Sequence, residues 1–482
     1  MSLRPTPMQA PVRRAPTDLP IAFADEAFVR RVSEANEEPD WRLADRIDGL
    51  RRFADLPIET NRLFTTYVDY RSVDLGELRP YVSVGAPPEA DGARLPTGAS
   101  AFLHIREDHV VARVLSPQAR EGGLFLGTFD EATGAAAAAL RRRLEGDTSL
   151  PDDDKLAQLT RASYGVGILC HVPAGLVLEE PIVIRWSVGR GNRGLLSRTV
   201  VILGEAAQAK VLEELDESGR TQGTPRANVA GAVGAQALWT GTSEVTLGPA
   251  AVLDIASLGE FGPRTVAFVN RRAELAEQAQ LRWAIASVGG AYVKSRIDNR
   301  LVGRGSGVGQ VEIVFGSGEQ HFDLTSYTRH LGEDTTSDLL SKGVLQERSR
   351  NFLKGLITIE RSARGSDSFL GEFGMLLGKK SRSVAIPALE IDQPNVRRAS
   401  HSSSVGPLDE NQLFYLESRG IERETARKMI VLAFLEPVVA RIPLPEAQER
   451  LRDLLDRKWL PAPSGEAAAE AAAAASDPAV PA

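Results

Sequence analysis

The stretch LAEQAQLRWAIASVGGAYVKSRIDNRLVGRGSGV, residues 275–308, decides the fold. It holds one pattern twice: an apolar residue that ends a short β-type run, a small side chain four residues later, and an apolar side chain two residues after that. The two copies consist of Leu275, Ala279 and Leu281 and of Val302, Ser306 and Val308. The small residue suits a tight corner between two strands, so the pattern predicts a strand–corner–strand unit that repeats.

Three more copies of this pattern occur along the chain. They consist of Leu203, Ala207 and Ala209, of Leu247, Ala251 and Leu253, and of Ile359 and Ala363. Successive end residues lie 44, 28, 27 and 57 residues apart, and 57 is about two periods of 28. The long first gap predicts an insertion around residues 217–228. A fixed repeat of short strands favours a β-solenoid over a two-sheet β-sandwich, because sandwiches show no repeat of this length.

Composition excludes several classes of protein. The 482 residues allow about three domains, or one long repetitive domain with appendages. A net charge of −7 and 6% aromatic residues argue against a partner made of nucleic acid or an anionic membrane. Cys170 is the only cysteine, so the chain forms no internal disulfide and no all-cysteine metal site alone. Without a long apolar run or a secretory leader, we expect a cytoplasmic protein.

Composition and hydrophobic pattern divide the chain into five regions. Residues 1–24 are Pro-rich and residues 461–482 form an Ala-rich tail, and we expect both to be disordered. Residues 25–160 form an N-terminal helical and mixed region. Residues 161–406 form the β-helix core, and residues 407–460 form a C-terminal helical domain.

Helical periodicity is strongest near the two ends. Residues 40–54 predict one helix, and its apolar face is expected to consist of Trp41, Ala44, Ile47, Leu50 and Ala54. Residues 408–415, 423–434 and 444–459 predict three more, with Gly420 as a C-cap between the first two.

Most candidate chemical motifs are weak. The segment 374–381 has three residues between its glycines where a phosphate loop needs four, so we interpret it as a basic turn. Cys170 and His171 are neighbours in a strand and point to opposite faces, which favours Cys170 as a core residue. His321, Asp323 and His330 have no diagnostic metal-ligand spacing, and scattered structural residues are favoured there.

His401 differs from these by its position, where the predicted solenoid meets the C-terminal helices. Neutral imidazole is a good ligand for iron and other borderline metals. The residues alone still favour a structural histidine over a ligand.

Several segments together resemble the SufB/SufD family of iron–sulfur cluster assembly proteins. They are residues 38–42 with Arg46, residues 172–182, residues 330–357 around His330, Thr335, Ser337, Phe352 and Gly355, residues 389–391, and residues 413–430 with the run Phe-Tyr-Leu-Glu-Ser-Arg-Gly. The resemblance covers about residues 25–460. It implies a right-handed parallel β-helix flanked by N-terminal and C-terminal helical regions, a mainly β fold that agrees with the repeat.

The resemblance also implies a function. The chain would be a non-enzymatic, SufD-like scaffold subunit that pairs with a SufB-like paralogue and docks a SufC-like ATPase. His401 would be a ligand of a transient iron–sulfur cluster shared with that partner, because SufD-like members offer a histidine that it matches. Ala399 stands where a cysteine often occurs, so the chain would not accept persulfide sulfur there as a SufB-like chain does. The docking residues would be Phe414, Tyr415, Ser418, Arg419, Gly420 and Ile421. The sequence does not indicate whether a flavin joins the complex.

Two alternatives remain open at this point. One is a β-helix lyase or hydrolase acting on polysaccharide, against which the low aromatic content and the missing carboxylate pair argue. The other is a homodimeric Suf-type scaffold without SufB.

Overall fold

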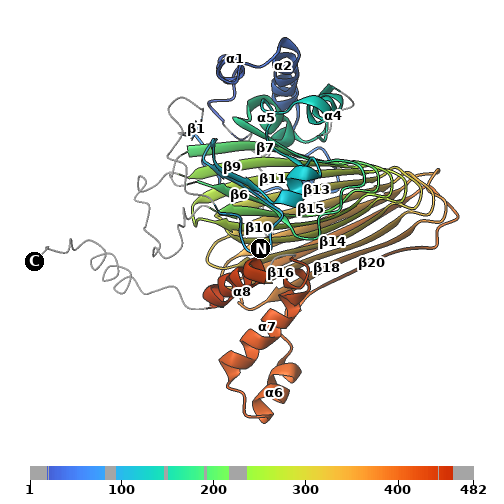
Figure 1. Cartoon of the computed structure of the whole chain (residues 1–482). Coiled ribbons are helices and arrows are strands. Elements are labelled where there is room, and N and C mark those ends of the chain that lie inside the picture. Colours follow the sequence, from blue (N-terminus) through green and yellow to red (C-terminus); the bar gives the residue numbers. More distant parts are fainter. Residues whose placement is uncertain are drawn as a thin grey trace, which may run out of the picture.

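The computed structural model describes residues 19, 21–76, 78–81, 94–145, 150–188, 193–216, 236–442 and 445–459. The expected disordered segments 1–24 and 461–482 lie mostly or wholly outside these residues. Strands dominate the described part and form a parallel β-solenoid of about eight turns, with helices at both ends of the chain (Figure 1). The predicted fold class is confirmed.

Successive strands of the solenoid alternate between two ten-stranded sheets, which we call sheet A and sheet B. Along sheet A the order is β19 (Arg382–Ile391), β17 (Arg350–Ile359), β15 (His321–His330), β13 (Tyr292–Leu301), β11 (Thr265–Leu275), β9 (Ala237–Leu247), β7 (Arg193–Leu203), β5 (Val166–Val172) and β4 (Phe125–Thr128), with β1 (Arg79–Pro80) beside β7. Along sheet B it is β20 (Arg398–Pro407), β18 (Asp367–Leu376), β16 (Thr336–Leu345), β14 (Gly307–Gly316), β12 (Gln280–Gly289), β10 (Val252–Phe261), β8 (Gln208–Asp216), β6 (Ile182–Ser187), β2 (Ala101–Arg106) and β3 (His109–Leu115).

The strand registers confirm the repeat and correct two of its positions. Leu247, Leu275 and Leu301 are paired in sheet A, so the residue equivalent to Leu275 is Leu301 and not Val302. Thr336 pairs with Asp367, which makes Ser366, and not Ala363, the equivalent of the corner residue Thr335. The corners after β13 and β17 are longer than four residues, which a fixed spacing cannot reveal.

The long first gap of the repeat is confirmed as a longer turn of the solenoid. Leu203 pairs directly with Leu247, 44 residues on. The segment 217–228, where we expected the insertion, lies outside the described residues.

The core lies between the two sheets. Side chains alternate between the faces of a strand, and the inward positions form columns of the same kind of residue from turn to turn. Ala209, Leu253, Leu281 and Val308 make one such column, paired one above another and almost fully buried. Each turn therefore buries its apolar face only against its neighbours, as the repeat predicted.

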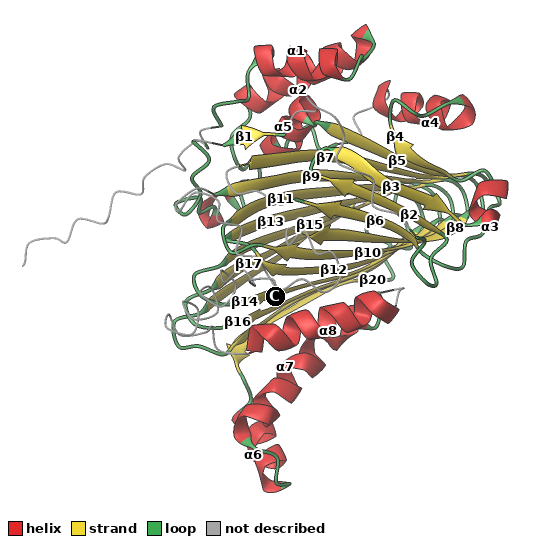
Figure 2. Cartoon of the chain, turned by 60° about the vertical axis from the view of Figure 1, so that its left-hand side comes forward, coloured by secondary structure: helices red, strands yellow, loops and turns green. Residues whose placement is uncertain are grey.

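One end of the solenoid is capped. There β4 pairs antiparallel with β5, and the hairpin of β2 and β3 extends sheet B, so antiparallel strands cover the first parallel turn and β4 and β3 become the outermost strands. The helices α1 (Glu26–Ala35), α2 (Asp40–Asp55), α4 (Gly134–Glu145) and α5 (Lys155–Ser163) lie at this end, as Figure 2 shows. The short helices η1 (Thr65–Tyr67) and α3 (Pro117–Glu121) complete the N-terminal region.

The predicted helix over residues 40–54 is present as α2, but its predicted apolar face is wrong. The buried residues of α2 are Arg42, Arg46 and Gly49. Arg46 is fully buried because its guanidinium donates to both carboxylate oxygens of Glu38 at 2.6 and 2.7 Å and stacks 3.7 Å from the ring centre of Tyr164. The ion pair lies within the N-terminal segment, and Arg46 fastens the helix to the start of the solenoid by donating to the carbonyls of Ala162 and Tyr164 at 3.2 and 3.0 Å.

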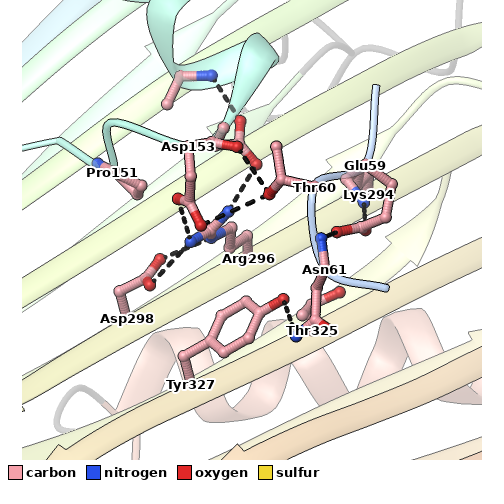
Figure 3. A network of polar contacts seen from close by, with 12 residues as sticks. Glu59, Thr60, Asn61, Pro151, Asp153, Lys294, Arg296, Asp298, Thr325 and Tyr327 are labelled. Carbon is pink, nitrogen blue, oxygen red and sulfur yellow. Dashed lines mark hydrogen bonds and ion pairs between the residues drawn. The ribbon is translucent and has the colours of Figure 1, made fainter. Parts of the chain in front are cut away.

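A polar network fastens the N-terminal region to the outer face of sheet A (Figure 3). The buried guanidinium of Arg296 donates to Asp298 at 2.8 Å on its own strand and to Asp153 at 2.9 Å in the segment before α5. Asn61 donates to the hydroxyl of Tyr327 at 3.3 Å. Segments far apart in sequence are thus joined across the face of two neighbouring strands, β13 and β15.

The C-terminal helices are α6 (Glu410–Ser418), α7 (Arg423–Val439) and α8 (Pro445–Trp459). Apolar residues of α7 and α8 pack on the outer face of sheet B, and Lys342 of β16 donates to the carbonyl of Phe434 at 2.9 Å. Helix α6 projects away from the strands in Figures 1 and 2. Among the described helices, none combines the length and apolar character needed to cross a bilayer.

Candidate functional site

The second end of the solenoid is open. Strands β19 and β20 each pair with one neighbour only and form the free edges of their sheets. The side chains of β19 are half-buried or exposed, and those of β20 are mostly exposed. Ile391 and Val405 leave 44% and 38% of their surface exposed here. An unpaired edge that exposes apolar side chains invites a further strand, so this end has properties of an interface, although β20 itself is mostly polar.

His401 lies in this open end, on β20. Its register partner is Leu370, which is fully buried in the core between the sheets. Residues paired across neighbouring strands share a face, so His401 occupies an inward-facing position of the last strand, and it is exposed because no turn follows. The imidazole is thus accessible from the open end.

The positions of Ala399 and Cys170 show that the open end has no cysteine ligand. Ala399 sits two residues before His401 on the same face and packs against the core. Cys170 is fully buried near the capped end, and burial raises the pKa of its thiol to about 12. The prediction that Cys170 is a core residue is confirmed, and the chain presents no thiolate at the open end.

Glu372 is a residue of this end that the sequence analysis missed. It pairs with Ser403 of β20, so it faces inward, and only 1% of its surface is exposed. Burial raises the pKa of its carboxyl to about 8, with partial compensation from the backbone N–H of Ile386. The available signal was a carboxylate at an inward position of a strand, two residues after Leu370, but it requires the strand register.

The other candidate residues have structural environments. His330 is fully buried, with its two ring nitrogens 2.8 Å from the hydroxyl of Thr335 and 3.0 Å from that of Ser337. Asp323 pairs with two buried lysines rather than with His321. No group of three or more metal-ligating side chains occurs within the part of the chain that the structure describes. The segment 374–381 is the end of β18 and the turn into β19, as interpreted.

A second candidate site lies on α6 and the turn that follows it. Phe414 and Tyr415 are 72% and 57% exposed, and Met429 of α7 lies exposed nearby in sequence. Gly420 takes a positive φ of 85° just after the helix, which confirms the predicted C-cap. Arg419 covers the ring of Tyr415 at 5.3 Å, and Ser418 donates to the Tyr415 carbonyl at 2.7 Å. Ile421 is half-buried and donates its N–H to the carbonyl of Leu416 at 3.2 Å, which closes the turn.

Fold and site together define a β-solenoid protein that is capped at one end and open at the other, with an accessible imidazole in its last strand. A family profile described as "SUF system FeS cluster assembly, SufBD core domain" matches residues 186–434, more than half of the chain. The chain therefore belongs to the SufB/SufD family of iron–sulfur cluster assembly proteins.

Relatives from two genera span nearly the whole chain. The iron–sulfur cluster assembly protein SufD of Bacillus subtilis is 24% identical over 90% of this chain and 98% of its own length. SufB of the same bacterium is 26% identical over 88% of this chain and 91% of its own length. A SufBD family protein of Staphylococcus saprophyticus is 25% identical over 89% of this chain and 91% of its own length. This membership favours iron–sulfur assembly over the polysaccharide enzyme considered from sequence.

Proposed function

We propose that this protein is a SufD-like, non-catalytic scaffold subunit for iron–sulfur cluster assembly. A SufB-like paralogue adds its own last strands to β19 and β20, and a transient cluster forms at the seam with His401 as one ligand. The observation that carries the proposal is the contrast between the two ends of one solenoid, one capped by antiparallel strands and helices, the other left open beside an accessible imidazole.

Cysteine usage supports a SufD-like rather than a SufB-like role. Iron–sulfur clusters are held mainly by thiolates, and the one thiol of this chain is sealed in the core far along the solenoid from His401. The chain can lend an imidazole, but the sulfur ligands must come from another subunit. The cluster is cargo of the complex, and the complex works in the cytoplasm.

The second half of the proposal concerns the ATPase partner. The exposed rings of Phe414 and Tyr415 stand on a helix that projects from the body, where a partner's groove can enclose them. The turn from Ser418 to Ile421 fixes their orientation through its capping hydrogen bonds. A SufC-like ATPase docked here would deliver conformational work next to the open end, since α7 leads directly from this turn back to sheet B.

The experiment that tests the ligand role replaces His401 in the assembled complex. The chain is co-expressed with the SufB-like and SufC-like proteins of its own organism and purified without oxygen. His401→Ala should keep the complex and its unfolding temperature but lose most of the reconstituted cluster absorbance, because the exposed ring makes no contact that holds the fold. A variant that assembles and transfers clusters like the unsubstituted complex would refute the assignment of His401.

A second experiment tests the open edge as the pairing surface. Ile391→Glu and Val405→Glu each place a charge on the edge and should abolish pairing with the SufB-like chain. Val302→Glu is the matched control, because Val302 is 44% exposed but lies at a corner of the solenoid away from this end. Light scattering of the chain alone and mixed with its partner distinguishes a heteromer from a homodimer; a stable homodimer unaffected by the partner contradicts the proposal.

A further inference from the structure

Three carboxylates share one inward-facing column of sheet B, and they differ in their surroundings. The column contains Glu213, Glu312 and Glu372 on strands β8, β14 and β18, and it ends at Ser403 on β20. Glu213 accepts from Ser257 at 3.0 Å, and Glu312 accepts from Ser295 at 2.6 Å. Glu372, the member nearest the open end, has no side-chain partner among the described residues.

The carboxylate of Glu372 lies in the core beside a glycine of the facing sheet. A Cβ on residue 355 would lie 2.6 Å from Cδ2 of Leu370 and 2.9 Å from Oε1 of Glu372, so the glycine at that position of β17 leaves space for both side chains. Its Oε2 is buried and forms no hydrogen bond, which is also true of Oε2 of Glu312, but Glu312 accepts from a serine hydroxyl, whereas the partner of Glu372 is the backbone N–H of Ile386. A buried carboxyl oxygen without a partner destabilises a protein, and the packing of the core gives no reason for one here.

His401 is the nearest ligand-type side chain by register. Leu370 pairs with His401 and Glu372 pairs with Ser403, so Glu372 and His401 are one strand and two residues apart on the same inward face. With about 4.8 Å between strands and about 3.3 Å per residue, their Cα atoms are about 8 Å apart. Side chains as long as glutamate and histidine bridge such a diagonal.

We propose that Glu372 is a second iron ligand of this chain, beside His401, at the mouth of the solenoid. One imidazole and one carboxylate form a typical half-site for ferrous iron. On binding, the carboxyl releases its proton to solvent, and the iron takes the place of the missing hydrogen-bond partner. The remaining ligands come from the partner subunit. This inference rests on the proposed function, because it assigns a further residue to the same site.

The test measures ferrous iron binding by the full chain in complex with its SufB-like partner, without oxygen, with free Fe²⁺ quantified by a colorimetric chelator after ultrafiltration. Glu372→Leu and His401→Ala should each weaken binding at least tenfold. Glu372→Leu should also unfold at a higher temperature, because a buried carboxyl with one unpartnered oxygen is replaced by an apolar side chain of similar size. Glu372→Gln, which keeps the shape, should weaken iron binding equally. A residue with a purely structural role is not expected to give both a higher unfolding temperature and weaker iron binding when it is replaced.

Glu312→Leu is the matched control, since it removes a carboxylate of the same column two strands further from the mouth, and it should leave iron binding unchanged. Wild-type iron affinity in both Glu372 variants, with His401→Ala weakened, overturns this inference and leaves the proposed function standing. Wild-type affinity in all three, or no more iron bound by the unsubstituted chain than by a Glu372→Leu, His401→Ala double variant, overturns both.

Discussion

His330 is predicted to make the fold sensitive to mild acid. It occupies a position where the neighbouring turns have Leu301 and Ile359, so a histidine stands in a column of aliphatic core residues. Burial lowers the pKa of its imidazole from 6.5 to about 4, with little compensation from Asp367. Thr335 and Ser337 have hydroxyl groups that satisfy either neutral tautomer, but they offer no negative charge to a protonated ring.

The magnitude follows from linkage. The unfolded chain takes up a proton near pH 6.5 and the folded chain only near pH 4, so the unfolded state binds more protons in between. Stability from this group is complete above pH 6.5 and is lost as the pH falls toward 4. The slope is about 1.4 kcal/mol per pH unit, and the total loss is about 3 kcal/mol.

Urea unfolding of the wild type and of His330→Gln at several pH values from 7 to 4.5 measures this effect. The variant should be less stable at pH 7, but the difference between the two proteins should shrink by about 1.4 kcal/mol for each pH unit below 6.5. Thr335→Val is the control, because it removes one hydroxyl partner but keeps the ring, and it should lose stability without losing the pH slope. Parallel curves for wild type and His330→Gln would show that the folded protein accepts the proton and that the reasoning is wrong.

Two further predictions concern a buried ion cluster and the docking helix. Asp323→Asn removes the carboxylate nearest to the buried Lys294 and Lys354 and leaves them the more distant Glu59, at 3.7 and 3.8 Å. Urea unfolding should show a loss of about 3 kcal/mol, partly recovered by adding Lys354→Met. Phe414→Asp and Tyr415→Asp should each abolish co-purification of the SufC-like ATPase while the unfolding temperature and the SufB-like partner are retained; retained ATPase in both variants would contradict the docking role.

Asp323, like His330, makes the protein less stable as the pH falls, but it does so over a lower pH range. Burial alone would raise the pKa of Asp323, but the ammonium groups of Lys294 and Lys354 outweigh it and hold the value at about 2. Its contribution is therefore present above pH 3.8, the usual value, and is lost as the pH falls toward 2. The two groups can be separated by pH in one set of unfolding curves.

The solenoid could be predicted because its physics is local and repetitive. Each turn must bury the same face against the next, so the small and apolar residues recur in sequence at nearly the period with which they stack, as Leu253, Leu281 and Val308 do. The errors arose at corners. Val302 was misaligned because the corner after Leu301 holds one more residue, and hydrogen bonds across the corner absorb it without disturbing the strands.

The sequence analysis found one of the candidate site residues and missed another. His401 was found by resemblance, and its exposure at the open end depends on the absence of a following turn, which no local pattern encodes. Glu372 was missed because alternation of faces becomes informative only once the register assigns Leu370 to the core. The buried face of α2 was missed for a related reason: Arg46 is buried by an ion pair to Glu38, and a helical pattern of apolar residues gives no hint of that.

The two ends of the solenoid differ in how their edge strands are protected. A stack of strands must end somewhere, and an unpaired edge is a liability that proteins blunt with short edge strands, charged side chains or covering helices and loops. At the capped end, sheet A ends in β4, a strand of four residues, and helices lie beside it. At β19 and β20 the chain leaves apolar side chains such as Val405 in solvent. Under the proposed function, a partner chain covers this second edge, and a site that takes ligands from two chains would form only in the complex.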